Sequence, residues 1–105
     1  MAVNKVTQDD FKAEVLDHKG LVFVDFFAEW CAPCKITSPL IKELSEEKKD
    51  IKFVEVDVDQ NSNLASQYSV FSIPTFIIFK DGKAVNQFVG AMGKEAFLEE
   101  IKKAE

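Results

Sequence analysis

The chain has 105 residues, of which 47% are hydrophobic and 30% charged, a composition typical of a single globular domain. Thirteen Lys and Arg against eighteen Asp and Glu give a formal charge of -5, which disfavours binding to nucleic acid or to an anionic membrane. Residues 1–10 do not resemble a signal peptide, and the uncharged stretch at residues 68–79 is interrupted by Pro74 and too short to span a bilayer. We therefore expect one cytoplasmic domain, residues 1–105; a bacterial or an organellar matrix fits equally.

The first predicted elements are a helix and a buried strand. Thr7 has an acidic residue three positions later, and Phe11 and Val15 follow at helical spacing, which predicts a helix over residues 7–17. Residues 21–27 (LVFVDFF) are almost continuously apolar. Such a run is typical of a strand that is covered on both faces of a sheet.

A second helix and a second strand follow. Apolar residues from Ile36 to Leu44 recur at helical spacing, so a helix should continue to about Lys49, with Pro39 kinking it rather than ending it. Residues 51–58 (IKFVEVDV) alternate well enough for a strand. The helix between the two strands makes this a βαβ unit, whose strands should be parallel.

The second half of the chain predicts an antiparallel hairpin and a closing helix. Asn61 can cap a short helix that reaches about Tyr68. Residues 75–80 and 83–89 flank an Asp-Gly pair, the strongest short hairpin signal. Residues 95–103 carry apolar side chains on one face and charges on the other, as in an amphipathic helix. The predicted fold class is therefore α/β, a mixed central sheet with helices on both faces.

Both cysteines lie in the segment EWCAPCK, residues 29–35, and three roles were weighed for them: a metal clip, a structural staple and a redox pair. Two cysteines are too few for a disulfide scaffold, and a core with ten Phe does not need a staple. A zinc site wants about four ligands, and His18 is far away in the sequence, in what we take to be a solvated loop. A C-x-x-C pair in a βαβ setting indicates redox chemistry.

The predicted helix distinguishes the two thiols. Cys31 lies at the first turn, where unpaired N–H groups and the positive end of the helix dipole stabilise a thiolate, so we assign it as the nucleophile. Cys34 lies one turn deeper and can attack a mixed disulfide on Cys31, so we assign it as the resolving thiol.

Two further residues are candidates for the site. Asp25 lies within an apolar run, where burial would raise its pKa and let it exchange a proton near neutral pH; an Asp that simply faces water is the alternative. Pro74 follows Ile73 in a stretch otherwise suited to a strand. Because proline cannot donate to a sheet ladder, it marks a strand start or a bend, and an ordinary trans turn fits as well.

These motifs together resemble the thioredoxin family over nearly the whole chain. The segment WCAPCK (residues 30–35) is a variant of the family's WCGPC motif and is preceded by VDFFAEW. Ile73-Pro74-Thr75 and Val89-Gly90-Ala91 follow in the family's order.

The resemblance implies the thioredoxin fold and the reduction of protein disulfides, with no cofactor and no metal. It also implies a monomer that is re-reduced by an NADPH-linked or a ferredoxin-linked thioredoxin reductase. By the same analogy, Asp25 is the base for Cys34 and the peptide bond before Pro74 is cis. The implied substrate-binding residues form an apolar apron around Cys31: Trp30, Ala32, Pro33, Ile73, Pro74, Gly90 and Ala91. Without the analogy, Trp30 could equally belong to the core.

Three positions depart from the family pattern. Glu55 stands where many bacterial members have Lys; leaning toward Asp25 it would raise the pKa of that carboxyl further, whereas facing solvent it would matter little. Phe27 replaces a frequent second Trp. Ala32 replaces the usual Gly. Because Ala favours the helix over Gly by about 0.5 to 1 kcal/mol, the turn into the helix should be stiffer. The sign of the effect on the redox potential is left open.

Two other functions fit the same fold. A disulfide isomerase or oxidase commonly has His between the cysteines and works in an oxidising compartment, and neither sign is present. A binding module would use the apron to hold a partner without turnover.

Overall fold

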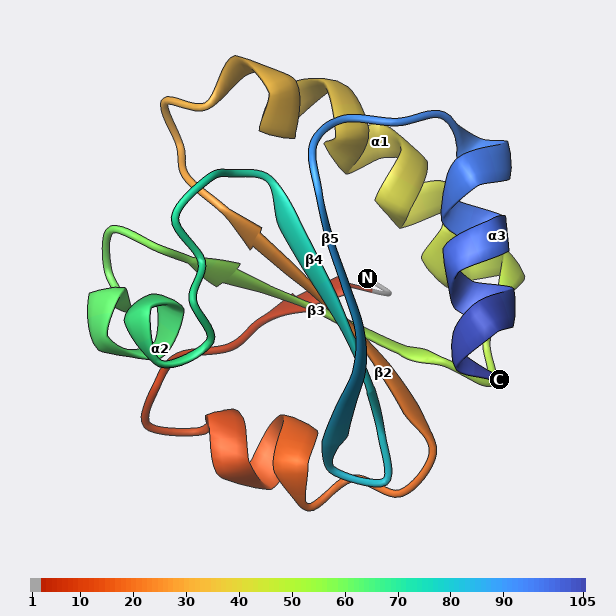
Figure 1. Ribbon diagram of the computed structural model, residues 1–105, viewed down its shortest axis with the longest axis horizontal. Helices are drawn as coiled ribbons and strands as arrows, with labels where there is room; N and C mark the ends of the chain where they lie inside the picture. Colours follow the sequence, from red (N-terminus) through yellow and green to blue (C-terminus); the bar gives the residue numbers. More distant parts are fainter. Residues whose placement is uncertain (1–2) are drawn as a thin grey trace.

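The computed structural model describes residues 3–105 as a five-stranded sheet with helices on both faces (Figure 1). Within these residues no helix has both the length and the apolar character needed to cross a membrane. The strands are β1 (Val3–Lys5), β2 (Leu21–Phe27), β3 (Lys52–Asp57), β4 (Thr75–Lys80) and β5 (Lys83–Val89). The helices are η1 (Lys12–Leu16), α1 (Ala32–Glu47), α2 (Ser62–Gln67) and α3 (Lys94–Ala104).

The strand order is β1-β3-β2-β4-β5. β3 pairs in parallel with both β1 and β2, whereas β4 pairs antiparallel with β2 and with β5. The predicted α/β class, mixed sheet and parallel βαβ unit are therefore confirmed. β1 was not predicted from the sequence, because a three-residue strand with two exposed positions carries no recognisable period.

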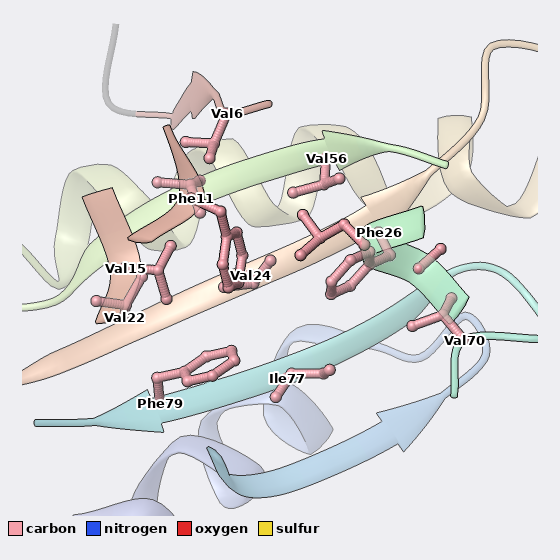
Figure 2. Close-up of a cluster of buried hydrophobic side chains, with 13 residues drawn as sticks. Val6, Phe11, Val15, Val22, Val24, Phe26, Val56, Val70, Ile77 and Phe79 are labelled. Atoms are coloured by element: carbon pink, nitrogen blue, oxygen red, sulfur yellow. The ribbon is translucent and has the colours of Figure 1, made fainter. Parts of the chain in front are cut away.

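The sheet separates two apolar clusters. One lies on the face covered by η1 and α2 and includes Val24, Phe26 and Phe79 (Figure 2). The other lies under α1 and α3 and includes Phe23 and Phe53, whose rings stack with centroids 5.1 Å apart. β2 contributes to both clusters, which explains why its sequence is apolar at nearly every position.

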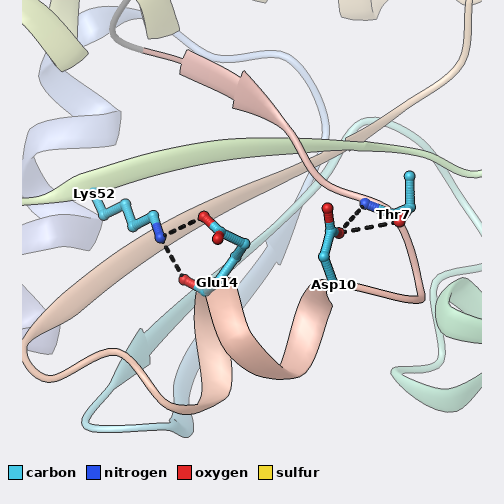
Figure 3. A network of polar contacts seen from close by, with 4 residues as sticks. All are labelled: Thr7, Asp10, Glu14 and Lys52. Atoms are coloured by element: carbon cyan, nitrogen blue, oxygen red, sulfur yellow. Dashed lines mark hydrogen bonds and ion pairs between the residues drawn. The ribbon is translucent and has the colours of Figure 1, made fainter.

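The first helix begins later than predicted. Thr7 does not cap it: the Thr7 N–H donates to Asp10 Oδ1 (2.6 Å) and closes a turn, while the helix starts at Lys12. The helix is π-type, since the N–H of Asp17 donates to the carbonyl five residues earlier (2.8 Å). Lys52 holds it to β3 by donating to the carbonyl and the carboxylate of Glu14, both at 2.8 Å (Figure 3).

Two details of the predicted helices also differ. Asn61 occupies the N-cap position of α2 but does not cap it with its side chain, which instead accepts from the Gln8 N–H (2.8 Å) and donates to the Asp57 carbonyl (3.0 Å). α1 runs through Pro39 as one helix, as predicted. Ile36, one of the apolar residues that indicated this helix, is 68% exposed, because its position on α1 points away from the sheet.

The predicted hairpin is confirmed in its turn as well as in its strands. Asp81 and Gly82 both have positive φ (51° and 85°), as a two-residue turn that matches the strand twist requires. A Cβ on Gly82 would collide with the Leu16 carbonyl oxygen of η1. The turn therefore depends on glycine for its conformation and for its close approach to the helix.

Candidate active site

The candidate site lies at the end of the sheet where β2 leads into α1 and where β4 begins and β5 ends (Figure 1). This geometry follows from the topology, since β4 runs antiparallel to both of its neighbours. Three segments far apart in the sequence thus meet beside the start of α1.

Cys31 is the N-cap of α1, with extended backbone, and Cys34 lies in the helix's first turn. Their Cα atoms are 5.3 Å apart, and the two residues form a disulfide. The Cys34 N–H donates to Cys31 Sγ (3.2 Å). Cys31 Sγ thus already accepts one of the unpaired N–H groups at the helix start, the environment that stabilises a thiolate once the bond is reduced.

The two cysteines do not differ in burial as expected. Cys31 is 3% exposed and Cys34 is 5% exposed, so in the disulfide form both are covered; they cluster with Ala28, and Phe27, Val58 and Ile73 pack against this cluster. The sequence placed Cys31 at the helix start correctly, and the resemblance placed later segments around it, but neither indicated that Cys31 is as buried as Cys34. The distinction between the two thiols therefore rests on their helix positions.

Asp25 is buried, with 4% of its surface exposed, and lies on β2 beside Glu55 of β3. Among residues 3–105 its Oδ1 has no hydrogen-bond partner. Burial, and to a lesser extent the negative charge of Glu55, raise the pKa of Asp25 from 3.8 to about 7. Asp25 is therefore buried and does not simply face water. Glu55 lies close enough to Asp25 for its charge to raise the pKa of that carboxyl.

Trp30 lies at the rim rather than in the core. It is 69% exposed, and its indole Nε1–H donates to Asp59 Oδ2 (2.8 Å), just after β3. Ala32 and Pro33, the first two residues of α1, are exposed beside it. A hydrogen bond on one edge of the indole holds the ring at the surface, where it can contact another molecule.

The peptide bond between Ile73 and Pro74 is cis, as the resemblance implied. Ile73 packs against the cysteine pair, while Pro74 is buried and its carbonyl accepts the N–H of Gly90 (2.8 Å). Ala91 follows Gly90 and is exposed. The predicted apron residues from the two later segments are thus linked to the cysteines through Ile73.

Two residues near the site were not found from the sequence. Phe71 precedes Ile73 by two positions and is 84% exposed, the most exposed large apolar side chain among the described residues. Asp59 supplies the acceptor for Trp30. An exposed Phe cannot be distinguished from a core Phe by sequence alone, although its place beside the Ile-Pro motif was an available signal.

No group of three or more His, Cys, Asp or Glu side chains within residues 3–105 is arranged to hold a metal ion. The reactive groups that the site presents are a dithiol and a buried carboxyl group. Such a set can exchange disulfides and move protons.

Comparisons with known proteins agree with this site. The Thioredoxin family model matches residues 2–103. A thioredoxin of Mycolicibacterium smegmatis is 46% identical over 102 residues, covering 94% of this chain and 91% of that protein. A thioredoxin of Bacillus subtilis is 44% identical over 104 residues, covering 98% of each chain. With a matching family model, relatives at this identity and a cysteine pair joined at the start of a helix, the chain belongs to the thioredoxin family and is a thiol-disulfide oxidoreductase.

Proposed function

We propose that the reduced protein donates two electrons to a disulfide of a protein substrate, with Cys31 as nucleophile and Cys34 as resolving thiol. The Cys31 thiolate attacks one sulfur of the substrate disulfide and displaces the other as a thiolate. Cys34 then attacks the mixed disulfide, which releases the second substrate thiol and leaves the Cys31–Cys34 disulfide. The observation that carries this proposal is the cysteine pair at the N-terminus of α1, where the helix dipole favours the Cys31 thiolate.

Asp25 is the base that removes the proton of Cys34 in the second step. It is buried, it lines the same cavity as Cys34, and its pKa of about 7 lets it accept and release a proton near neutral pH. A carboxyl group with the usual pKa would be a much weaker base toward a thiol.

Protein substrates dock on an apolar surface around the disulfide. It comprises the predicted residues Trp30, Ala32, Pro33, Ile73, Pro74, Gly90 and Ala91, to which we add Phe71. Exposed aromatic side chains such as Trp30 and Phe71 favour a folded protein as substrate over a small disulfide compound, because aromatic residues supply much of the binding energy at protein interfaces.

The remaining proposals concern the protein's setting. We expect one domain that acts as a monomer in the cytoplasm and is re-reduced by a thioredoxin reductase. Which reductase serves it is tested by measuring turnover with an NADPH-linked and with a ferredoxin-linked enzyme. Activity with one and not the other identifies the electron donor, and catalysis of disulfide formation instead of reduction would favour an oxidase.

The roles of the two cysteines are tested with Cys31→Ser and Cys34→Ser. Cys34→Ser keeps the nucleophile and lacks the resolving thiol, so it should accumulate a mixed disulfide with a disulfide-bearing protein. Cys31→Ser should form none, because the remaining thiol is not the one at the N-cap. A non-reducing gel detects the adduct and mass spectrometry locates the bond. Equal capture by both variants would show that the assignment is wrong.

A further inference from the structure

Three ionisable residues form a row across neighbouring strands on the face covered by α1. Lys5 of β1 is the register partner of Glu55 of β3, and Glu55 is the register partner of Asp25 of β2. Side chains in register on adjacent parallel strands lie on the same face of the sheet. Burial increases along the row, since Lys5 is exposed, Glu55 half-buried and Asp25 buried.

A cavity of about 230 Å³ opens along this row. Asp25, Cys34 and Glu55 line it together, and the exposed side chains of Lys5, Glu29 and Lys35 form its outer part. The volume is far larger than the roughly 30 Å³ that one water molecule occupies in the liquid, so the polar walls can be bridged by water. The cavity therefore joins the resolving thiol, the buried acid and the half-buried acid to the surface.

The proposed reaction leaves a proton on Asp25 that must reach solvent. When Cys34 gives its proton to the Asp25 carboxylate, the protonated acid is buried among apolar side chains. Before Asp25 can act as a base again, this proton must leave. A second carboxylate between Asp25 and the surface offers an acceptor of the same chemical kind, so the transfer costs little in either direction.

We propose that Glu55 relays protons between Asp25 and solvent through this cavity. The inference rests on the proposed role of Asp25 as base. Glu55 touches no reacting sulfur in this scheme; it is a positioning residue that acts through Asp25. The proton passes from the Cys34 thiol to Asp25, then to Glu55 and to water, while the Cys34 thiolate forms the new S–S bond and the substrate sulfur leaves as a thiolate.

The charges around Glu55 suit a relay. Its pKa is raised by burial and by Glu29 and lowered by Lys5, which also pairs with Glu29 (3.7 Å). On the helix side, Lys35 lines the same cavity and Lys42 lines a neighbouring one that also touches Asp25 and Glu55. Two adjacent acids that resist simultaneous ionisation hold a shared proton more readily than either alone.

The test compares Glu55→Gln with Glu46→Gln, a control that removes an exposed carboxylate of α1 that does not line this cavity. The rate of disulfide reduction is measured over repeated turnovers, with excess protein disulfide and a chemical reductant, across neutral pH, at low buffer concentration and with added imidazole. Glu55→Gln should slow turnover about tenfold, less than the roughly 10²-fold or more expected for loss of a base, and imidazole should restore the rate. The control should stay near the wild-type rate without imidazole.

Two further measurements separate a relay from a structural effect. Glu55→Asp keeps a carboxylate and should retain most of the rate. The carboxyl of Asp25, followed by NMR, should titrate at lower pH in Glu55→Gln, because a neighbouring negative charge is gone.

The outcomes distinguish this inference from the proposal on which it rests. If Asp25→Asn is slow while Glu55→Gln keeps the wild-type rate at low buffer, Asp25 is the base and the relay is wrong. If Asp25→Asn resolves at the wild-type rate, both fail. A slow Glu55→Gln that imidazole does not accelerate would also overturn the relay, since a structural defect is not rescued by a proton carrier.

Discussion

Asp25 shows how one residue can be costly to the fold and useful to the reaction. It occupies a position on β2 where every neighbour along the strand is apolar, and its Oδ1 has no partner among the described residues. A carboxyl group in such a place avoids ionising, because a buried charge without compensation is unfavourable. The same resistance suits the role of base near neutral pH that we propose for Asp25.

The pH dependence of stability follows from this raised pKa. Below about pH 3.8, Asp25 is protonated in both folded and unfolded chains and makes no difference. Between about 3.8 and 7 the unfolded chain releases the proton while the folded chain keeps it, so the folded state loses stability as the pH rises. Above pH 7 the full cost is present, about 4 kcal/mol at most for a shift of about three units.

Asp25→Asn should therefore stabilise the protein, by about 1 to 4 kcal/mol above pH 7 and by little below pH 4. Urea unfolding of the oxidised protein across this pH range measures the difference. The same variant should resolve mixed disulfides roughly 10²-fold more slowly. A constant stability difference at all pH values would mean that Asp25 ionises in the folded protein as it does in the unfolded chain.

At the scale of elements, the β4–β5 turn packs closely against the backbone of η1 and is hydrogen-bonded to the residue just before β2. Gly82 faces the Leu16 carbonyl, and the Asp81 side chain accepts the Gly20 N–H (2.8 Å) while the Asp81 N–H donates to the Gly20 carbonyl (3.0 Å). The turn thereby fixes the start of β2 as well as the hairpin. Residues with positive φ at such contacts have two reasons to be glycine.

Gly82→Ala and Gly20→Ala form a matched pair that separates these two reasons. Both glycines have similar φ (85° and 94°), but a Cβ on Gly20 meets nothing within 4 Å. Gly20→Ala should cost about 1 to 2 kcal/mol for its backbone, and Gly82→Ala about 2 to 4 kcal/mol because a collision is added. Denaturant unfolding measures both values, and equal losses would show that η1 moves away without cost.

At the scale of the whole molecule, exposed apolar side chains gather near the disulfide from separate parts of the chain. Trp30 and Phe71 lie in different loops, at 69% and 84% exposure, yet both belong to the end of the sheet that holds the cysteines. A folded chain that leaves such residues uncovered presents a surface for transient contact.

Phe71→Ser should weaken the reduction of a protein disulfide, raising KM about tenfold, and leave the rate with a small disulfide reagent unchanged. The matched control is Val85→Ser, which removes an exposed apolar residue (48%) from β5 near the hairpin turn, and should change neither. Sedimentation should give the mass of one chain for the wild type and for both variants. Unchanged KM in Phe71→Ser would exclude this side chain from the docking surface.

Much of the fold and of the chemistry could be predicted from local patterns. The apolar run of β2, the Asp-Gly turn and the amphipathic α3 each carry a signal within a few residues, because strand burial, turn geometry and helix periodicity are local properties. Cys31 and Cys34 are three positions apart on one helix start, so their pairing is local as well.

Other features depend on segments that meet only in three dimensions. The sequence alone determined an α/β fold, a redox cysteine pair at a helix N-terminus and an acid within a buried strand. Only the tertiary structure decided that β1 adds an edge to the sheet, that both cysteines are buried in the disulfide form, and that Glu55 stands beside Asp25 in one cavity. The reason is physical: burial, cross-strand register and the pKa of a buried acid depend on neighbours from distant parts of the chain, which no local pattern specifies.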